Sequence, residues 1–189
     1  MYFCPIINKN MKTKIIIIIW MLFASLNSFA QKLDENKIDS FTKDTVKRTS
    51  WENLISKSFT SNKGNAYFRI SKINQHYFFE FKYFDLSGSV FSISENDKLM
   101  LKLENDSIYT LKNLKYTITE RGAGAIGLYG SAVIGINASY INLDDIGFKT
   151  LMGKKVIQIR FYTSLGYLEY DIQSKNAEKL INAVKLINQ

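Results

Sequence analysis

The stretch "AYFRISKINQHYFFEFKYF" (Ala66–Phe84) decides the fold. Every second position of its second half is aromatic: Tyr77, Phe79, Phe81 and Tyr83. The positions between them mix aromatic and charged residues: Phe78, Glu80, Lys82 and Phe84. Successive side chains of a β-strand point to opposite faces, so this alternation indicates a strand with one wholly aromatic face. Ala66–Ile73 is also strand-like, and Asn74-Gln75 between the two halves predicts a tight antiparallel hairpin.

More short strands follow, separated by polar turns. Apolar and polar residues alternate most clearly over Lys98–Leu103, and again over Lys115–Glu120. A second hairpin is predicted from Val156–Thr163 and Gly166–Ile172. The remaining predicted strands are Val90–Ser94, Ile108–Leu111 and Asn137–Ile141. Such a succession is typical of an antiparallel sheet linked by hairpins.

Helical spacing is clearest at the C-terminus. Ser174 is the predicted N-cap of a helix over 175–187, whose apolar residues lie three and four apart: Ala177, Leu180, Ile181, Val184 and Ile187. Shorter helices are predicted from Ser50 onward and over Leu143–Met152. The expected fold class is therefore α+β, a mainly antiparallel, strongly bent sheet or partly open barrel with a C-terminal amphipathic helix.

In outline, this order of elements resembles the pleckstrin-homology-like superfold, in which a curved sheet is capped by a final helix. The resemblance covers roughly residues 66–187 and rests on element order, without a diagnostic motif. Extra strands and a glycine-rich insert depart from the family pattern. The resemblance implies a fold and no site residues, because one fold carries many functions.

The N-terminus has the three parts of a secretory leader. Met11-Lys-Thr-Lys14 is positively charged, Ile15–Phe23 is an unbroken apolar run, and Ser28-Phe-Ala30 offers small residues at the cleavage positions. The run is shorter than the roughly 20 apolar residues that a membrane-spanning helix needs. We expect residues 1–30 to be a removable signal peptide, with Met11 as an alternative start, and the protein to be periplasmic or extracellular.

Behind the leader, we expect a polar linker over 31–50 and a single β-rich domain over 51–189. Cys4 is the only cysteine, so the chain after the leader has no thiolate nucleophile, disulfide or sulfur-ligated metal. Loss of the leader's three lysines leaves 22 basic residues against 17 acidic ones, a net charge of +5. This excess suits anionic envelope surfaces, and it equally keeps a soluble protein dispersed.

The glycine-rich stretch "RGAGAIGLYGSAVIGINASY" (Arg121–Tyr140) contains the spacing G-x-G-x-x-G. A dinucleotide site needs a helix to start at such glycines and a parallel strand to follow. The glycines and β-branched residues that come next disfavour that helix, so we expect no dinucleotide cofactor. Small-xxx-small spacings leave a membrane-spanning helix as an alternative. We favour a glycine-rich loop or β-hairpin.

The tip of such a loop or hairpin would expose apolar side chains, and loop tips often carry function. The candidate contact residues are Ile126, Leu128, Tyr129 and Val133. They would contact a partner protein, a glycan, a lipid surface or a second copy of this chain.

No catalytic, cofactor or metal site is indicated by the sequence. His76 is the only histidine, so no histidine-rich metal site can form. Asp144-Asp145 is most simply the start of a helix, and Glu169 and Asp171 are most simply a solvated strand face. Three tyrosines surround one hairpin, where core or cross-strand packing is simpler than stacking on sugars or bases: Tyr162, Tyr167 and Tyr170.

These observations favour an exported, non-enzymatic binding or interaction module of the Gram-negative cell envelope, with no nucleic-acid partner. The alternative is a membrane-active protein that inserts residues 121–138. A hydrolase that uses Asp144 or His76 is the third hypothesis.

Overall fold

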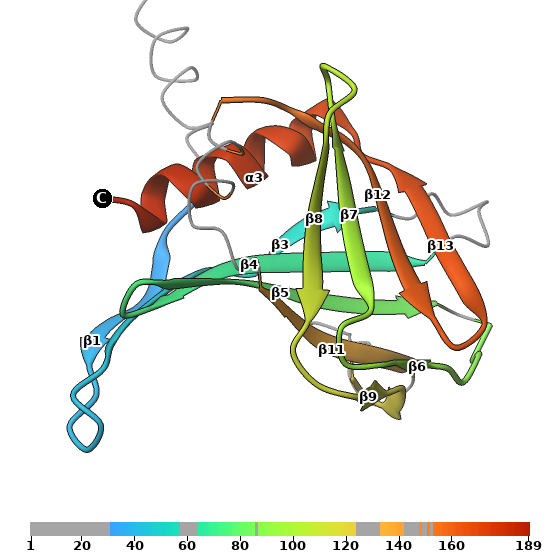
Figure 1. Ribbon diagram of the computed structural model, residues 1–189, viewed down its shortest axis with the longest axis horizontal. Helices are drawn as coiled ribbons and strands as arrows, with labels where there is room; N and C mark the ends of the chain where they lie inside the picture. The colour runs from blue at the N-terminus through green and yellow to red at the C-terminus, as the bar shows by residue number, and fades with distance from the viewer. Residues whose placement is uncertain are drawn as a thin grey trace, which may run out of the picture. The chain divides into compact units, whose positions relative to one another are not determined.

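The computed structural model describes residues 31–56, 64–85, 87–123, 133–141, 148, 151 and 153–189. The expected signal peptide lies outside these residues. Gln31–Gln189 forms one compact unit. Its described part contains an eleven-stranded sheet, a two-stranded sheet and a C-terminal helix (Figure 1).

The main sheet runs in the order β1-β2-β4-β5-β11-β8-β7-β12-β13, with β3 beside β4 and β10 beside β11. Its first strands are β1 (Leu33–Ile38), β2 (Thr45–Thr49), β3 (Glu52–Ile55), β4 (Asn65–Ile73) and β5 (His76–Asp85). The others are β7 (Lys98–Leu103), β8 (Ile108–Asn113), β10 (Glu120–Arg121), β11 (Ile134–Ile141), β12 (Val156–Thr163) and β13 (Gly166–Asp171). The small sheet pairs β6 (Ser92–Ile93) with β9 (Thr117–Ile118).

Strand β11 joins the two halves of the main sheet. The first half contains β1 to β5, and the second half contains β8, β7, β12 and β13. Strand β11 pairs with β5 along its whole length, but with β8 only through Tyr140 and Ile141. Figure 1 shows β7, β8, β12 and β13 running across the direction of β3, β4 and β5. The sheet is therefore bent over a core and does not close into a barrel. The expected α+β class with a bent, antiparallel sheet is confirmed.

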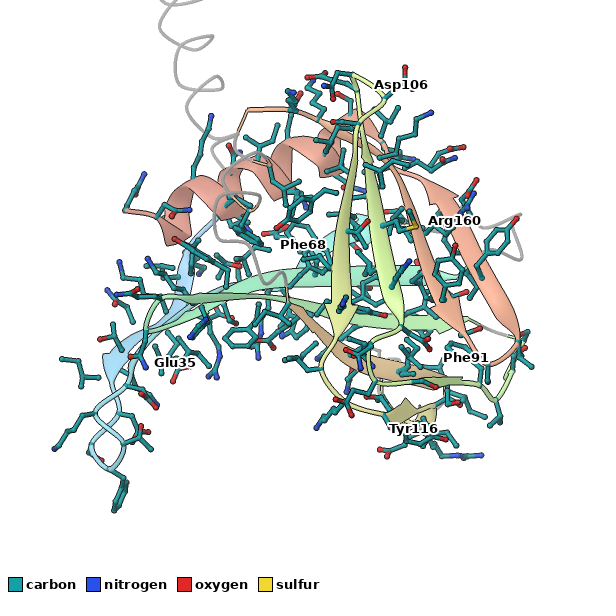
Figure 2. All side chains as sticks on the ribbon, viewed as in Figure 1. Glu35, Phe68, Phe91, Asp106, Tyr116 and Arg160 are labelled. Carbon is teal, nitrogen blue, oxygen red and sulfur yellow. The ribbon has the colours of Figure 1, made fainter. Side chains whose placement is uncertain are left out.

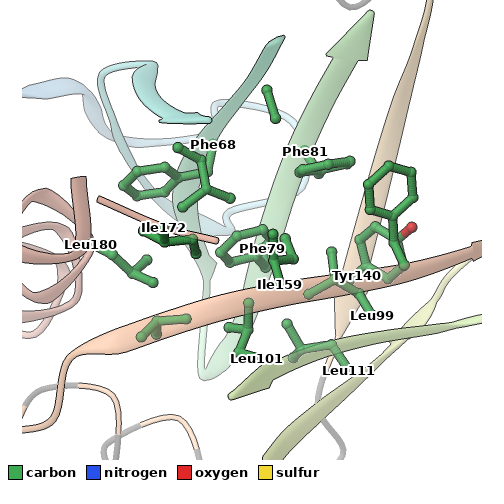
Figure 3. Packing of buried hydrophobic residues seen from close by; sticks show 14 of the residues in the cluster. Phe68, Phe79, Phe81, Leu99, Leu101, Leu111, Tyr140, Ile159, Ile172 and Leu180 are labelled. Atoms are coloured by element: carbon green, nitrogen blue, oxygen red, sulfur yellow. The ribbon is translucent and has the colours of Figure 1, made fainter. Parts of the chain in front are cut away.

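The aromatic face of β5 lies at the centre of the core (Figure 3). The four aromatic residues predicted to share this face, Tyr77, Phe79, Phe81 and Tyr83, are all buried. The Phe81 ring lies 5.0 Å from the Phe161 ring on β12, and the Tyr83 ring lies 5.2 Å from the same Phe161 ring. Both contacts are T-shaped, a geometry that aromatic pairs favour. The alternation of β5 thus supplies the contact between the two halves of the sheet.

Helix α3 (Ser174–Ile187) packs on β2, β3, β4 and β12. Its predicted apolar stripe is buried except for Ile181, which is half-buried. The Asn176 side chain donates a hydrogen bond to the Leu54 carbonyl at 3.1 Å and so ties the helix to β3. The predicted Ser174 cap is wrong: the N-cap is Gln173, and the Ser174 hydroxyl accepts a hydrogen bond from Lys155 Nζ at 3.0 Å.

Two expectations for the start of the domain are wrong. Strands β1 and β2 occupy the stretch expected to be a polar linker over 31–50, and the sheet buries two residues of β2, Val46 and Thr49. The residues after Ser50 form β3 instead of a helix, because Leu54 and Ile55 are buried beside β4. Most of the predicted helix over Leu143–Met152 lies outside the described residues.

The two ends of the glycine-rich stretch pair with each other. Glu120 lies opposite Gly135, and the Gly122 amide donates a hydrogen bond to the Val133 carbonyl at 2.8 Å. The flanks therefore form an antiparallel hairpin, whereas a dinucleotide fold requires a parallel strand after a helix. Residues 124–132 between these flanks lie outside the described part.

Gly135 is packed closely between the backbone of this hairpin and the backbone of β5. A Cβ atom at this position would lie 2.0 Å from the Ala123 carbonyl oxygen and 2.7 Å from the Tyr83 carbonyl oxygen. Both obstacles are backbone atoms, so a side chain can be accommodated only if the hairpin moves.

We expect Gly135→Ala to lower the free energy of unfolding by about 1–3 kcal/mol, because an overpacked site forces a backbone shift. Gly153→Ala is the matched control, since a Cβ there meets nothing within 4 Å. Its effect should stay within about 0.5 kcal/mol. Urea denaturation measures both variants, and equal stability of the two would contradict the close approach at Gly135.

Candidate binding face

The second half of the sheet buries one face and presents the other to solvent. Along β7, three leucines point into the core while Lys98, Met100 and Lys102 point outward. The strand registers place these residues beside the outward residues of the neighbouring strands. We name this surface the outer face; its members are Lys98, Met100, Lys102, Ile108, Thr110, Lys112, Gln158, Arg160, Tyr162, Tyr167, Glu169 and Asp171.

Two shallow depressions lie on the outer face. The larger has a volume of about 330 Å³ and is lined by Met100, Lys102, Asp106, Ile108, Gln158, Arg160 and Glu169. The smaller, of about 280 Å³, is lined by Asn96, Asp97, Lys98 and Tyr162. Figure 2 labels Arg160 on β12 and Asp106 at the turn between β7 and β8. Lys98 and Met100 share one face of β7, so the two depressions follow each other along the strand.

Two cations of the outer face, Arg160 and Lys102, are held in ion pairs. Arg160 Nε donates a hydrogen bond to Glu169 Oε2 at 2.6 Å, and Lys102 forms an ion pair with Asp106 at 2.9 Å. Hydrogen bonds with Glu169 and then Tyr162 raise the pKa of the Arg160 guanidinium above its usual value. Arg160 therefore stays charged and is held in a fixed position on β12.

Aromatic rings stand beside these charges. Tyr162 and Tyr167 are directly opposite each other on β12 and β13, with ring centroids 6.1 Å apart. The Arg160 guanidinium lies 4.5 Å from the Tyr167 ring centroid, within cation–π range. Tyr167 is 57% exposed. The expected cross-strand packing of these two tyrosines is confirmed, and it leaves the Tyr167 ring accessible on the outer face.

Tyr170, the third tyrosine of this hairpin, belongs to the core. Its side chain is buried, and its hydroxyl shares a hydrogen bond with the Tyr83 hydroxyl at 2.6 Å. Alternation along β13 explains the difference, because Tyr167 and Tyr170 are three residues apart and so point to opposite faces.

The structure places only one of the candidate contact residues from the glycine-rich stretch. Val133 is buried, with 7% of its surface exposed, so its expected exposure near a loop tip is wrong. It lies at the base of the hairpin, immediately before β11, where its carbonyl accepts the Gly122 amide. Ile126, Leu128 and Tyr129 lie outside the described residues, and their contacts with a partner or membrane stay a prediction.

A group of exposed apolar residues lies where the glycine-rich stretch leaves the sheet. We name it the end patch; it consists of Val90, Tyr116, Ile118 and Leu165, each at least 40% exposed. Ser92 of β6 links its parts, because it lies opposite Ile118 and its carbonyl accepts the Ser164 amide at 2.8 Å. Figure 2 labels Tyr116 at this end of the unit. The strand pattern did not reveal the patch, since its residues come from three separate segments of the chain.

Among the described residues, His76 lies on β5, whereas Glu169 and Asp171 lie on β13. His76 is exposed at the first residue of β5, while Glu169 is paired with Arg160 and Asp171 accepts a hydrogen bond from Gln158. Asp144-Asp145 lies outside the described residues. Among the residues that the structure describes, no three His, Cys, Asp or Glu side chains form a group that could hold a metal ion. In the same part of the chain, no helix is long and apolar enough to cross a membrane.

Comparison with known protein families, with curated proteins and with solved structures finds no match to this chain. The bent antiparallel sheet and the C-terminal helix are compatible with the expected pleckstrin-homology-like outline. Function is therefore inferred from the outer face and the end patch.

We expect Tyr170→Phe to lower the free energy of unfolding by about 1 kcal/mol, because it removes a buried hydrogen bond. The same substitution at Tyr167 is the matched control on the same strand, and its effect should stay within about 0.5 kcal/mol. Thermal unfolding of the two variants measures the difference. If Tyr167→Phe lowered the stability more than Tyr170→Phe, then the assignment of Tyr170 to the core and Tyr167 to the outer face would be incorrect.

Proposed function

We propose that this protein is an exported, non-enzymatic binding module of the bacterial cell envelope, and that the outer face of β7, β8, β12 and β13 holds its partner. One observation supports this proposal: the outer face combines open depressions, a paired Arg160 and an accessible Tyr167 ring. Binding sites typically combine a concave surface with a few polar groups at fixed positions. The Arg160–Glu169 pair and Tyr167 provide such groups here.

The chemistry of the outer face suits recognition better than catalysis. A general base needs a pKa near the working pH and a free proton-accepting atom. Arg160 has a raised pKa and stays protonated, and Lys102 is held in an ion pair with Asp106. His76 lies on β5, away from the strands of the outer face. These groups can position a partner, whereas they have no evident route for proton transfer.

Export and fold membership are part of the same proposal. The predicted leader supports transport across the inner membrane, and the net charge of +5 after its removal suits an anionic envelope environment. We also propose that the domain is a member of the pleckstrin-homology-like superfold, on the basis of its bent sheet and final helix. That kinship adds no site residue, since function depends on the site and not on the fold.

The end patch favours contact with a lipid surface as a second candidate function. Its four exposed apolar residues lie beside the start of the glycine-rich stretch, and Ile118 is three residues before Arg121. Exposed apolar patches mark contacts with proteins or membranes. In this second candidate, the end patch and the glycine-rich stretch would enter the lipid interface together.

Photo-crosslinking in intact cells of the native bacterium separates the two functions. A benzophenone amino acid replaces Thr110 on the outer face, Ile118 in the end patch, or Lys185 on the exposed side of α3 as the control. Thr110 neighbours Met100 across the strands without joining the ion pairs, so its replacement should leave the face intact. We expect a discrete protein or glycan adduct from position 110 and none from position 185.

The adducts decide between the candidates because each position reports on one surface. Lipid adducts from position 118 alone would favour membrane contact over the outer face. Equal adducts from all three positions, or none from position 110, would contradict a binding role for the outer face.

A further inference from the structure

Strand β13 is the last strand at one end of the main sheet. The turn before it determines which of its residues hydrogen-bond to β12. The two-residue turn Ser164-Leu165 makes Thr163 and Gly166 a hydrogen-bonded pair, and such pairs alternate along an antiparallel ladder. The Ile172 amide, which donates to the Ile157 carbonyl at 2.8 Å, confirms this phase. Gly166, Leu168 and Tyr170 therefore direct their backbone groups toward β12.

The residues between them direct their backbone groups the other way. Tyr167, Glu169 and Asp171 each turn one N–H and one C=O toward the side of β13 where the described part of the chain has no neighbouring strand. Among the described residues, no backbone hydrogen bond reaches these groups. Unpaired strand edges are templates for a further strand.

The two ends of the sheet differ in how they resist such pairing. Strand β1 has an irregular register between Leu33 and Glu35 and carries three charged residues, including Lys37. Bulges and lysines are common devices that block edge pairing. Strand β13 has a continuous register over six residues and contains neither lysine nor proline; its two charged residues, Glu169 and Asp171, are both acidic and lie on one face. The open edge at β13 is therefore the one suited to accept a strand.

We propose that the free edge of β13 binds an extended segment of a partner protein, which pairs with it as an additional strand. This inference rests on the proposed binding function and names the class of partner. Three N–H and three C=O groups repeat along the edge at the spacing of alternate strand residues, about 6.8 Å. An extended polypeptide offers complementary groups at that spacing, whereas a sugar or a lipid headgroup does not.

The side chains of β13 define which sequence such a segment would have. On the outer face, the added strand would lie beside Tyr167 and the carboxylates of Glu169 and Asp171, which favour basic residues. On the opposite face, it would lie beside Leu168, which is partly buried against the core, and so favour an apolar residue. The matching segment alternates basic and apolar residues.

A labelled peptide of alternating lysine and valine, seven residues long, tests this pairing on the chain from Gln31 to Gln189. Fluorescence anisotropy measures its dissociation constant. A second peptide carries N-methyl groups on the alternate amides that would face β13, so it keeps the side chains and charges but lacks those donors. We expect the methylated peptide to bind at least about tenfold more weakly, because each lost hydrogen bond contributes about 0.5–1.5 kcal/mol.

Two variants test the same edge by changing the protein instead of the peptide. Tyr167→Pro removes an outward N–H and leaves the bonds to β12 in place, a position where edge strands tolerate proline. Tyr167→Ala is the matched control, which removes the ring and keeps the N–H. We expect the proline variant to bind the lysine–valine peptide about two- to tenfold more weakly than the alanine variant, because one hydrogen bond is lost.

Failure to bind the lysine–valine peptide, or equal affinity for its methylated form, would overturn edge pairing. The methylated peptide keeps this test valid even if Tyr167→Pro fails to fold. If position 110 still forms its adduct in cells, then only the edge pairing is wrong and the outer face remains a binding surface. If the protein does not bind the peptide and position 110 forms no adduct, then the proposed function is wrong as well.

Discussion

The buried aromatic face of β5 is the interaction on which the rest of this structure depends. Phe81 and Tyr83 contact Phe161 across the core, so the side chains of β5 hold the two halves of the bent sheet against each other. Because alternate residues of a strand point to opposite faces, the same packing turns the polar residues of β7 and β12 outward. The outer face is therefore a direct consequence of how the core is filled.

The way the sheet bends also determines where a partner can bind. β11 contacts β8 only at its end, and the sheet does not close on itself. An open sheet must have edges, and each edge carries unpaired backbone groups. One edge is irregular and contains a lysine at β1, while the other is regular at β13 and adjoins Arg160 and Tyr167. The fold therefore leaves β13 as the regular edge to which the proposed partner strand binds.

Strong alternation made some elements predictable from the sequence. The hairpin around Asn74-Gln75 and the helix over 175–187 agree with the structure within a residue or two. β1 and β2 were missed because they form with only a few inward apolar residues, among them Val46. The free edge of β13 and the end patch could not be predicted from the sequence. Periodicity predicts which residues of a strand share a face, but it does not predict which strands lie next to each other. Contacts between distant segments decide those neighbours.

Amide hydrogen exchange along β13, resolved residue by residue, tests the central claim most directly. In the free protein, the amides of Leu168 and Tyr170 should exchange slowly because they bond to β12, and those of Tyr167, Glu169 and Asp171 should exchange quickly. An alternating pattern of this kind would establish an intact outer strand with an open edge. Uniform protection would mean that another segment already occupies the edge, and uniform exchange would mean that β13 is not a stable strand; either result would contradict the account.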